Sequence, residues 1–491
     1  MPDHRAAHVE ALHPAPDPAR ACERLAGLPY RLFLDSAARG SRLGRYSFLA
    51  ADPVLVVRSK GRRTECVDRI RGTSTISTGD ALDAVRTQLA PHQVAATPGL
   101  PPFQGGAAGY IAYDWGAVLE RLPATRYDDL ALPDVVLPVY DWVLAWDHES
   151  HAAWLISTGL PETTPGATLE RAATRAAQVR EWLAHGVETP TPQPTYDGAA
   201  QRAPSYPVDR GWWDSRLDVR SSFTRDDYIA AVDRVREYIF AGDIFQANLS
   251  QRFDAALREP AWELYCRLRV RNRAPFAAYL DFPEALVLSA SPERFLRADP
   301  SGHVETRPIK GTRPRGVGPE HDAALGQALT ESAKDRAENL MIVDLMRNDL
   351  SRVCAPGTVR VPELFALERY ATVHHLVSTV VGTLAPGMDV VDLLRASFPG
   401  GSITGAPKLR AMEIIAELEP SSRGVYCGSI GYWSVTGELD TNIAIRTAVV
   451  QGGRVYFSAG GGIVADSNAG QEYQETLDKA RGIIDSLIAS V

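Results

Sequence analysis

The amino-acid sequence predicts an α+β protein. Apolar residues make up 45% of the 491 positions and charged residues 23%, which is typical of a chain that packs a hydrophobic core. Short strand-like segments, each bounded by Gly, Pro, Asp or Ser, recur along the chain. Segments with helical spacing lie between them without strict strand–helix alternation, so a doubly wound parallel sheet is not expected.

The N-terminal half is predicted to contain short antiparallel strands and one long helix. Residues 1–20 are expected to be a disordered leader, because they are polar and carry four prolines. A helix is predicted over 169–185, where apolar residues recur with helical spacing. The predicted strands lie at 31–34, 46–51 and 54–57, with a further strand after the glycines of 105–109.

A proline-rich interval at 187–222 is the clearest boundary in the chain. Such a composition is typical of a linker or a long surface loop. The interval is expected to separate an N-terminal region, 21–186, from a C-terminal domain, 223–491.

The C-terminal half is predicted to alternate four helices with further strands. Thr224 is a candidate N-cap and Gly242 a stop signal for the first helix. The other helices are predicted at 332–346, 408–419 and 471–488. The predicted strands lie at 244–253, 277–282, 285–289, 294–298, 428–435, 442–450 and 454–459.

Composition excludes several classes of protein. The net charge of −8 argues against an electrostatic interaction with nucleic acid or an anionic membrane as the function. We expect a cytoplasmic protein, since no apolar run reaches membrane-spanning length and the leader lacks an apolar signal core. The five cysteines contain no C-x-x-C pair, which argues against a disulfide framework and a zinc site.

Lys310 is the first candidate catalytic residue. It lies among Arg307, Arg313 and Arg315, and each nearby positive charge favours the neutral amine. A neutral lysine amine is a nucleophile. The alternative is a solvated basic loop that forms salt bridges with acidic neighbours.

Two acidic pairs are candidate ligands of a divalent cation. Asp335 and Glu338 lie three residues apart on a predicted helix, and Glu472 and Glu475 repeat this spacing on the last helix. Carboxylates on two helices can hold Mg²⁺ through one or two direct bonds and several waters. The alternative is two exposed faces with an ordinary ion pair between Glu475 and Lys479.

Two further features could bind a carboxylate. The predicted turn Gly460–Gly462 offers unobstructed backbone N–H groups. Arg446 lies in a predicted apolar strand, where it needs an anionic partner, either a ligand or an internal salt bridge. The segment 400–408 departs from a P-loop, which disfavours nucleotide triphosphate chemistry. His375 follows His374 in a predicted strand, where the default for the inward histidine is a structural role.

Several motifs in one order then identify a family. They are Ser289–Glu293, Pro308–Arg313, Ala337–Leu345, Arg347–Leu350, His375–Ser378, Gly405–Lys408, Ala459–Val464 and Glu472–Thr476. Together they resemble the chorismate-utilising enzymes, whose fold implies antiparallel sheets packed as a sandwich, flanking helices and two interleaved subdomains.

The resemblance also implies roles for individual residues. Mg²⁺ would be held by Glu338 and Glu475 directly and by Asp335 and Glu472 through water. Glu293 would be the general acid, with His375 beside it. The substrate would be bound by Gly311, Thr312, Tyr426, Arg446, Gly460, Gly461, Gly462 and Lys479.

Two positions indicate the branch of the family. The members that add water carry a lysine base where this chain has Gln246. Lys310 occupies a position that is usually Ala in the anthranilate synthases and Lys in the aminodeoxychorismate synthases. The resemblance therefore implies conversion of chorismate and ammonia to 4-amino-4-deoxychorismate through a Lys310 adduct, in p-aminobenzoate and folate synthesis. Anthranilate synthesis is the alternative, and a non-catalytic scaffold that binds an amidotransferase is a more distant one.

The resemblance implies partners as well. The chain has no glutaminase nucleophile motif, so ammonia would come from a separate glutamine amidotransferase subunit. A pocket for L-tryptophan would be lined by Ser36, Arg45, Tyr46, Pro275, Phe276 and Ala277. A plain packing role for Ser36 is the alternative.

Overall fold

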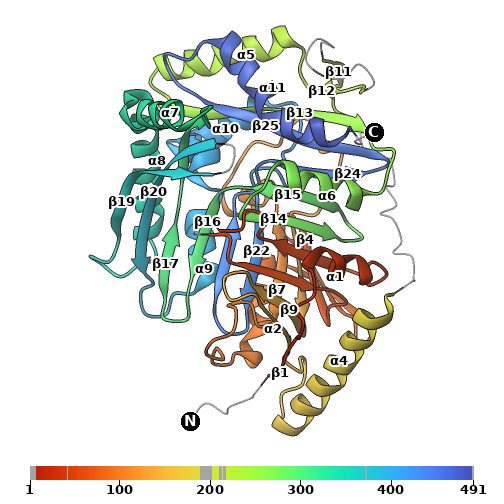
Figure 1. The fold of residues 1–491 in the computed structure, drawn as a ribbon. Helices are drawn as coiled ribbons and strands as arrows, with labels where there is room; N and C mark the ends of the chain where they lie inside the picture. Colours follow the sequence, from red (N-terminus) through yellow and green to blue (C-terminus); the bar gives the residue numbers. More distant parts are fainter. Residues whose placement is uncertain are drawn as a thin grey trace.

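Two antiparallel β-sheets form the centre of the molecule, and helices cover their outer faces (Figure 1). The computed structural model describes residues 7–40, 43–187, 202–208, 213, 217–370 and 373–488. The predicted fold class, an α+β sandwich with interleaved halves, is confirmed.

The first sheet contains thirteen strands within the described residues. Its strands pair antiparallel, for example β2 with β14 and β13 with β25. In spatial order they are β1 His8–Ala11, β10 Ala152–Ser157, β9 Trp142–Asp147, β3 Tyr46–Ala50, β2 Arg31–Asp35, β14 Phe276–Asp281, β15 Leu286–Ser291, β24 Thr447–Gln451, β25 Arg454–Ile463, β13 Gln246–Ala256, β12 Arg220–Ser221 and β11 Tyr206–Pro207, with β21 Gly405–Ala406 paired to β13.

The second sheet contains twelve strands in the described part of the chain. Their spatial order is β18 Ile309–Pro314, β20 Val373–Thr383, β17 His303–Thr306, β16 Arg294–Ala298, β23 Leu439–Asn442, β22 Ser429–Ser434, β7 Gly106–Ile111, β8 Val135–Tyr140, β4 Leu55–Lys60, β5 Arg63–Asp68 and β6 Thr73–Thr78, with β19 Arg360–Arg369 paired to β20.

Side chains from both sheets share one apolar core, which makes the pair a sandwich. Leu32, Ala278 and Val287 of the first sheet and Tyr110, Val136 and Ile430 of the second belong to the same buried cluster. Successive residues of a strand point to opposite faces, so each sheet also has an outer apolar face that needs covering. The helices bury those outer faces.

The helices are distributed over both sheets. Figure 1 shows α5 and α11 side by side next to β13 and β25, and α8 beside β20. They are α1 Pro18–Arg24, α2 Ala81–Leu89, α3 Gly116–Leu119, α4 Pro165–His185, α5 Arg225–Phe240, α6 Ala261–Arg271, α7 Pro319–Glu331, α8 Ala333–Ser351, α9 Val390–Ser397, α10 Lys408–Leu418 and α11 Ala469–Ser486. No helix among the described residues has the length and apolar character needed to cross a membrane.

Side-chain caps fix where the helices that carry candidate site residues begin. The Thr224 hydroxyl accepts from the N–H of Asp227 at the start of α5, as predicted. Ser332 caps α8 in the same way by accepting from the N–H of Asp335. Asn468 caps α11. These caps set the position of the first turns of α8 and α11, which carry Asp335 and Glu472.

The prediction of a disordered leader over residues 1–20 is wrong for its described part. Strand β1 pairs with β10, and α1 begins at Pro18 with Asp17 as its cap. The polar composition was misleading because β1 is an edge strand, whose backbone pairing does not require an apolar sequence.

The predicted linker at 187–222 also differs from the structure, although most of its first half lies outside the described residues. At its C-terminal end, β11 pairs with β12, which in turn pairs with β13, so this part extends the first sheet. The two halves of the chain do not form separate sheets, because β2 pairs with β14 and β7 pairs with β22.

Two local predictions in the C-terminal half are wrong. The predicted strand 442–450 is interrupted at 443–446, where Arg446 has a positive φ of 51°. The predicted turn at Gly460–Gly462 is the end of β25, paired with β13. Glycine indicates a turn when the backbone must bend, but here it permits close packing, since a Cβ on Gly460 would lie 2.4 Å from the carbonyl oxygen of Leu249.

Candidate active site

Lys310 lies in a bulge of strand β18. Ile309 pairs with Val377 and Thr312 with His375, so Lys310 and Gly311 together face the single residue Leu376. Gly311 has a φ of 86°, a conformation that suits glycine. A bulge changes the direction in which a side chain leaves the strand, and bulges are common next to active sites.

The amine of Lys310 has a lowered pKa, mainly because of burial. Glu338, Glu293 and Glu475 oppose this shift, and Lys479 adds to it. The predicted cause, crowding by arginines, is wrong. Arg307 is bonded to Glu363 and Glu368, and Arg313 to Asp335, so these positive charges are compensated by acidic partners.

Glu293 is buried close to Lys310. Burial raises the pKa of Glu293 to about 7, although hydrogen bonds from Ser402 and from the N–H of Ile309 oppose the shift. The residue is 4% exposed. A carboxyl group with such a pKa holds its proton near neutral pH and can deliver it, as a general acid must.

His375 is buried on strand β20, opposite the Lys310 bulge. Its Nδ1 lies 2.9 Å from the hydroxyl of Thr312. Burial, reinforced by the positive charge of Arg446, lowers the pKa of His375 to about 3. The imidazole is therefore neutral, and the structure brings Gly311, Thr312, His375 and Arg446 into one neighbourhood.

Arg446 lies in the break between β23 and β24. The segment around it pairs with the β15–β16 connection, because Ile443 N–H donates to the Glu293 carbonyl and Ala290 N–H donates to the Arg446 carbonyl. Burial lowers the pKa of Arg446. Among the described residues its guanidinium forms no ion pair, so the internal salt bridge considered from sequence is absent there. A half-buried guanidinium without an acidic partner is suited to an anionic ligand.

Tyr426 is buried near the same connection. Its ring lies 6.0 Å from the guanidinium carbon of Arg423, which is bonded to Glu419. The next residue, Cys427, donates its N–H to the carbonyl of Ala444. Tyr426 therefore lies beside the segment that carries Arg446.

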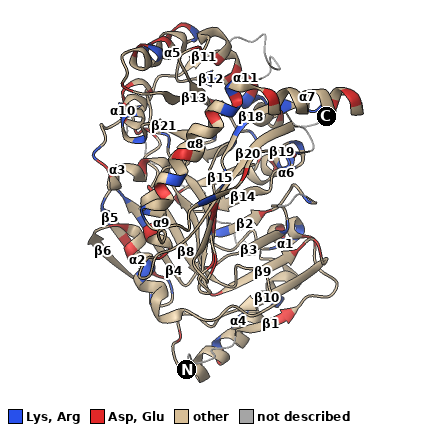
Figure 2. Ribbon diagram, turned by 90° about the vertical axis from the view of Figure 1, so that its left-hand side faces the viewer, with Lys and Arg blue, Asp and Glu red and all other residues tan. Residues whose placement is uncertain are grey.

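Asp335 and Glu338 of α8 lie on the side of the helix that faces β18. Figure 2 shows acidic and basic residues interspersed along this helix. Burial raises the pKa of Glu338, and the positive charge of Lys310 opposes this. Asp335 accepts a hydrogen bond from Arg313 at 2.8 Å. Glu338 therefore acts on the Lys310 amine, while Asp335 is bonded to the same strand two residues beyond the bulge.

The carboxylates of α11 lie beside β25. A Cβ on Gly461 would lie 3.2 Å from Glu472 Oε2 and 3.5 Å from Glu475 Oε1. Lys479 Nζ lies 2.7 Å from Glu475 Oε1 and donates to the Gly460 carbonyl at 2.8 Å. Burial alone would raise the pKa of Glu475, but Lys479 lowers it overall. The ordinary Glu475–Lys479 ion pair expected as the alternative is thus present, next to the site.

The donor chemistry of this region fits Mg²⁺. The charges of Glu338 and Glu475 both act on the pKa of Lys310, and the charge of Glu472 acts on that of Glu338. The missing side chain of Gly461 leaves space beside Glu472 and Glu475. Among the described residues, no three His, Cys, Asp or Glu side chains are close enough together to hold a metal ion by themselves. A cation here would take few direct carboxylates and keep several waters, which is the usual coordination of Mg²⁺.

Sequence reasoning missed Ser402, Lys334 and the full importance of Gln246. Ser402 bonds Glu293, and Lys334 acts on Glu338, Glu472 and Glu475. Both amide atoms of Gln246 are buried without a partner in the described structure. One sequence signal could have found Lys334. Of the 52 basic residues besides histidine only five are lysines, Lys60, Lys310, Lys334, Lys408 and Lys479, and three of these gather here.

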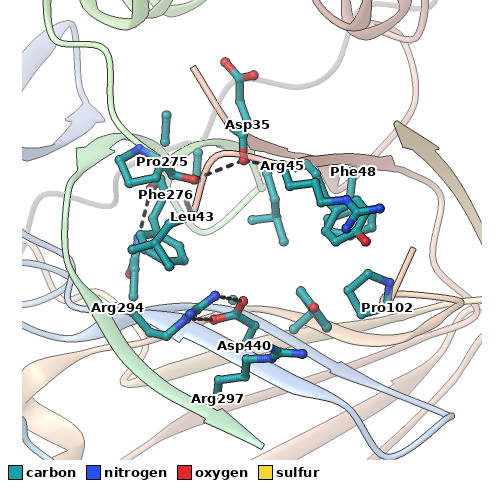
Figure 3. A pocket seen from close by; sticks show the side chains of 18 of the residues that line it. Asp35, Leu43, Arg45, Phe48, Pro102, Pro275, Phe276, Arg294, Arg297 and Asp440 are labelled. Carbon is teal, nitrogen blue, oxygen red and sulfur yellow. Dashed lines mark hydrogen bonds and ion pairs between the residues drawn. The ribbon is translucent and has the colours of Figure 1, made fainter. Parts of the chain in front are cut away.

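A cavity of about 360 Å³ is lined by residues from strands of both sheets. Ser36, Arg45, Tyr46, Pro275, Phe276 and Ala277 all line it. Figure 3 shows Arg294 facing Asp440 on one side of the cavity and Arg45 with Phe48 on another. Ser36 also has a packing role, because its hydroxyl donates to the carbonyl of Tyr46 at 2.6 Å.

The fold and the site are those of an α+β enzyme with acid and base groups in a buried centre. The chorismate binding enzyme family matches residues 31–485, and the chain belongs to that family. It is 44% identical over 467 residues to aminodeoxychorismate synthase component 1 of Salmonella typhimurium, covering 94% of this chain and 93% of the relative. It is 40% identical to anthranilate synthase component 1 of Pseudomonas aeruginosa, with 94% and 90% covered. The crystal structure of anthranilate synthase component I from Streptococcus pneumoniae superposes with a TM-score of 0.74 at 32% identity, covering 90% of this chain and 92% of that one.

Proposed function

We propose that this chain converts chorismate and ammonia to 4-amino-4-deoxychorismate. The observation that carries the proposal is a lysine amine with a lowered pKa close to a carboxyl group whose pKa is raised to about 7. These are the protonation states that a nucleophile and a general acid need at neutral pH. The similarity to aminodeoxychorismate synthase component 1 of several bacteria supports the same reaction.

In the first step, the Lys310 amine attacks C2 of the ring. The two ring double bonds shift, and the C4–O bond breaks. Glu293 gives its proton to the departing hydroxyl group, which leaves as water. The new C2–N bond joins substrate and lysine covalently, and the lysine nitrogen then loses a proton.

In the second step, ammonia attacks C4 and the double bonds shift back. The C2–N bond breaks, and the lysine leaves as an amine after regaining a proton. The sum is chorismate plus ammonia giving 4-amino-4-deoxychorismate plus water. Dividing the substitution into two allylic steps lets nitrogen enter on the face that the hydroxyl group left.

The other site residues would bind the substrate. Arg446 is suited to a carboxylate because it is half-buried and forms no ion pair with any described acidic residue, and Tyr426 lies beside the segment that carries it. Strand β24 pairs with β25 only as far as Phe457, whereas β13 pairs with β25 through Ile463. On the β24 side, backbone N–H groups near Gly460–Gly462 can therefore face a ligand. Glu338, Glu475 and Glu472 would hold Mg²⁺, which when bound supplies positive charge for the ring carboxylate.

Scarcity of lysine supports a nucleophilic role for Lys310. The chain uses arginine at most of its basic positions, and arginine cannot lose its proton in a protein.

The ammonia would come from a separate glutamine amidotransferase. Chorismate chemistry of this kind consumes ammonia, and this sequence contains no glutaminase nucleophile motif. The relatives that carry the aminodeoxychorismate synthase name are designated component 1, which supports a second component.

We also propose that the 360 Å³ cavity takes L-tryptophan. The cavity is of suitable size and combines aromatic walls, Tyr46 and Phe276, with charged groups of both signs. Calorimetric titration with L-tryptophan tests this. Binding that is lost in Phe276→Asp, and no comparable binding of L-alanine, is the expected result.

Mass spectrometry tests the proposed reaction. Protein quenched with chorismate and Mg²⁺ but without ammonia should carry an adduct of chorismate minus water, mapped to Lys310. With ammonium present, the product should be 4-amino-4-deoxychorismate. Release of fluorescent anthranilate, without any lyase, would instead favour the anthranilate synthase alternative. Absence of any turnover would favour a scaffold.

A further inference from the structure

Asp335 is bonded to strand β18. Arg313 Nη2 donates to Asp335 Oδ2 at 2.8 Å, and Arg313 Nη1 donates to the carbonyl of Thr312 at 2.9 Å. The N–H of Asp335 donates to the Ser332 hydroxyl, which caps α8. Arg313 therefore ties the strand that carries Lys310 to the first turn of α8.

Asp335 also packs directly against the bulge. A Cβ on Gly311 would lie 3.0 Å from both the Cβ and Oδ1 of Asp335, and 2.9 Å from Leu329 Cδ1. The side chain of Asp335 is 15% exposed. The backbone next to Lys310 thus rests on the aspartate itself, and a longer side chain at position 335 would have to displace it.

The bulge needs such support, because its ladder is interrupted. Regular pairing with β20 stops at Ile309 and resumes at Thr312. The backbone of Gly311 is hydrogen-bonded to the His375 side chain, but without ladder bonds the bulge can shift by fractions of an ångström unless further contacts hold it. On the α8 side, the contact that holds it is the Arg313–Asp335 pair.

We propose that Arg313 and Asp335 clamp the β18 bulge and thereby position the Lys310 amine. The inference rests on the proposed function, since that function makes Lys310 the nucleophile. Arg313 and Asp335 are positioning residues. Aspartate suits the clamp because its short side chain reaches Arg313 without moving Gly311.

Chemical labelling tests the clamp without chorismate. The variants are Arg313→Leu, Arg313→Lys, Asp335→Asn and Asp335→Glu. Asp344→Asn is the matched control, since Asp344 lies on the same helix and pairs with Arg347, away from β18. Each protein is treated with trinitrobenzenesulfonate over a range of pH, and labelling of Lys310 is followed by peptide mapping against the exposed Lys334.

A loosened bulge lets water reach the amine, so the midpoint pH for labelling Lys310 should rise in Arg313→Leu and Asp335→Glu. Turnover should fall on the order of tenfold to a hundredfold, because small displacements of a reacting group are costly. Arg313→Lys should retain most of both properties, and Asp344→Asn should behave as the parent protein. The Mg²⁺ dissociation constant, measured by calorimetry, should change less than about twofold in Arg313→Lys and Asp335→Glu, because both keep their charge and the charge of Asp335 acts on Glu338.

The opposite pattern overturns the clamp. If Asp335→Asn weakens Mg²⁺ binding tenfold or more while labelling of Lys310 is unchanged, Asp335 belongs to the metal site. Tolerance of Asp335→Glu in both measurements also contradicts the clamp. Failure of the proposed function is a separate result, namely no chorismate adduct on Lys310 in the parent protein.

Discussion

Lys310 and Glu293 have pKa values shifted in opposite senses by the same cause. Burial disfavours the charged form of each, so the amine tends to neutrality and the carboxyl group to protonation. Each also carries a weaker opposing contribution from the other's charge. Two titratable groups with separated roles in one buried place are typical of acid–nucleophile catalysis.

Removing the amine tests the role of Lys310. Lys310→Ala and Lys310→Arg should both lose product formation by at least about a thousandfold, because neither supplies a neutral amine. Chorismate and Mg²⁺ binding, followed by calorimetry, should persist. Arginine is the sharper variant, since it keeps a positive charge near Glu338. Activity retained in Lys310→Arg would contradict a covalent role.

The pH dependence of turnover follows from the same two groups. Glu293 must be protonated, so the rate should fall as pH rises above about 7. Lys310 must be neutral, so the acid limb should rise with pH through its lowered pKa. A bell-shaped profile of kcat/KM is expected, and Glu293→Asp should keep a profile of this shape. A rate that keeps climbing to pH 9 would exclude Glu293 as the proton donor.

Glu293 should also lower folding stability at alkaline pH. Its pKa is raised from 4.5 to about 7 in the folded state, so the folded protein binds more protons than the unfolded chain between these values. Stability should fall as pH rises through this window, by up to about 3 kcal/mol. Glu293→Gln should therefore be more stable than the parent at pH 8 but not at pH 4, as measured by urea unfolding. Equal differences at both pH values would show that burial does not shift this group.

The glycines Gly460–Gly462 have two different roles within strand β25. Gly460 and Gly462 pack against the neighbouring strand, since their Cβ atoms would meet Leu249 and Gln246 at 2.4 and 2.5 Å. Gly461 faces the carboxylates of α11 instead. Alternation along the strand thus assigns neighbouring glycines to different tasks.

Alanine substitutions should separate these tasks. Gly460→Ala should destabilise the protein by about 1–3 kcal/mol, because its methyl group overlaps the backbone of β13. Gly461→Ala should leave stability nearly unchanged but weaken Mg²⁺ binding by about tenfold, through crowding of Glu472 and Glu475. Unfolding and calorimetric titration measure the two effects. Gly79→Ala is the control, since no atom of the described residues lies within 4 Å of its Cβ position. Equal loss of stability in both β25 variants would contradict this division.

Elements with a strong period and a cap could be predicted from the sequence. Helices α5 and α8 begin where Thr224 and Ser332 indicate, and β22 lies within the predicted strand. Helix α7 was not predicted, because its start at Pro319 follows a Gly-rich basic segment with no capping side chain. The 443–446 break was missed because apolar residues continue through it, and only tertiary pairing with the Glu293 segment bends the chain there.

The sequence predicted which residues form the candidate site, but not why the pKa of Lys310 is lowered. Motif order placed Glu293, Lys310 and His375 in one site, and the structure brings them into one neighbourhood. The cause of the lowered pKa of Lys310 could not be predicted from the sequence, because the order of charged residues does not show which arginines form ion pairs in the folded protein. Arg307, with its side chain 1% exposed, is bonded to Glu363 at 3.0 Å. Such pairing depends on contacts distant in sequence.

At the scale of the whole molecule, both sheets combine the two halves of the chain. The pairings β2–β14 and β7–β22 cross the predicted boundary at 187–222. Each half would expose unpaired strand edges and the shared apolar core if separated.

Fragments test this interdependence. Residues 21–186 and 223–491 expressed separately should aggregate or remain unfolded. A protease site inserted between residues 188 and 200 and then cut should leave two fragments that co-elute in size-exclusion chromatography with near-parent circular dichroism. A soluble, cooperatively unfolding 223–491 fragment would show that the C-terminal half is an autonomous domain.

The place of β24 and β25 in the first sheet also has a consequence during synthesis. These strands are made almost last, yet they lie between β15 and β13, which leave the ribosome some 150 to 200 residues earlier. Strands β15 and β13 therefore keep unpaired edges until β24 and β25 have been synthesised. Folding of this sheet should therefore be slow, as expected for pairings between residues so distant along the chain. Chaperones that cover the unpaired strand edges should promote it.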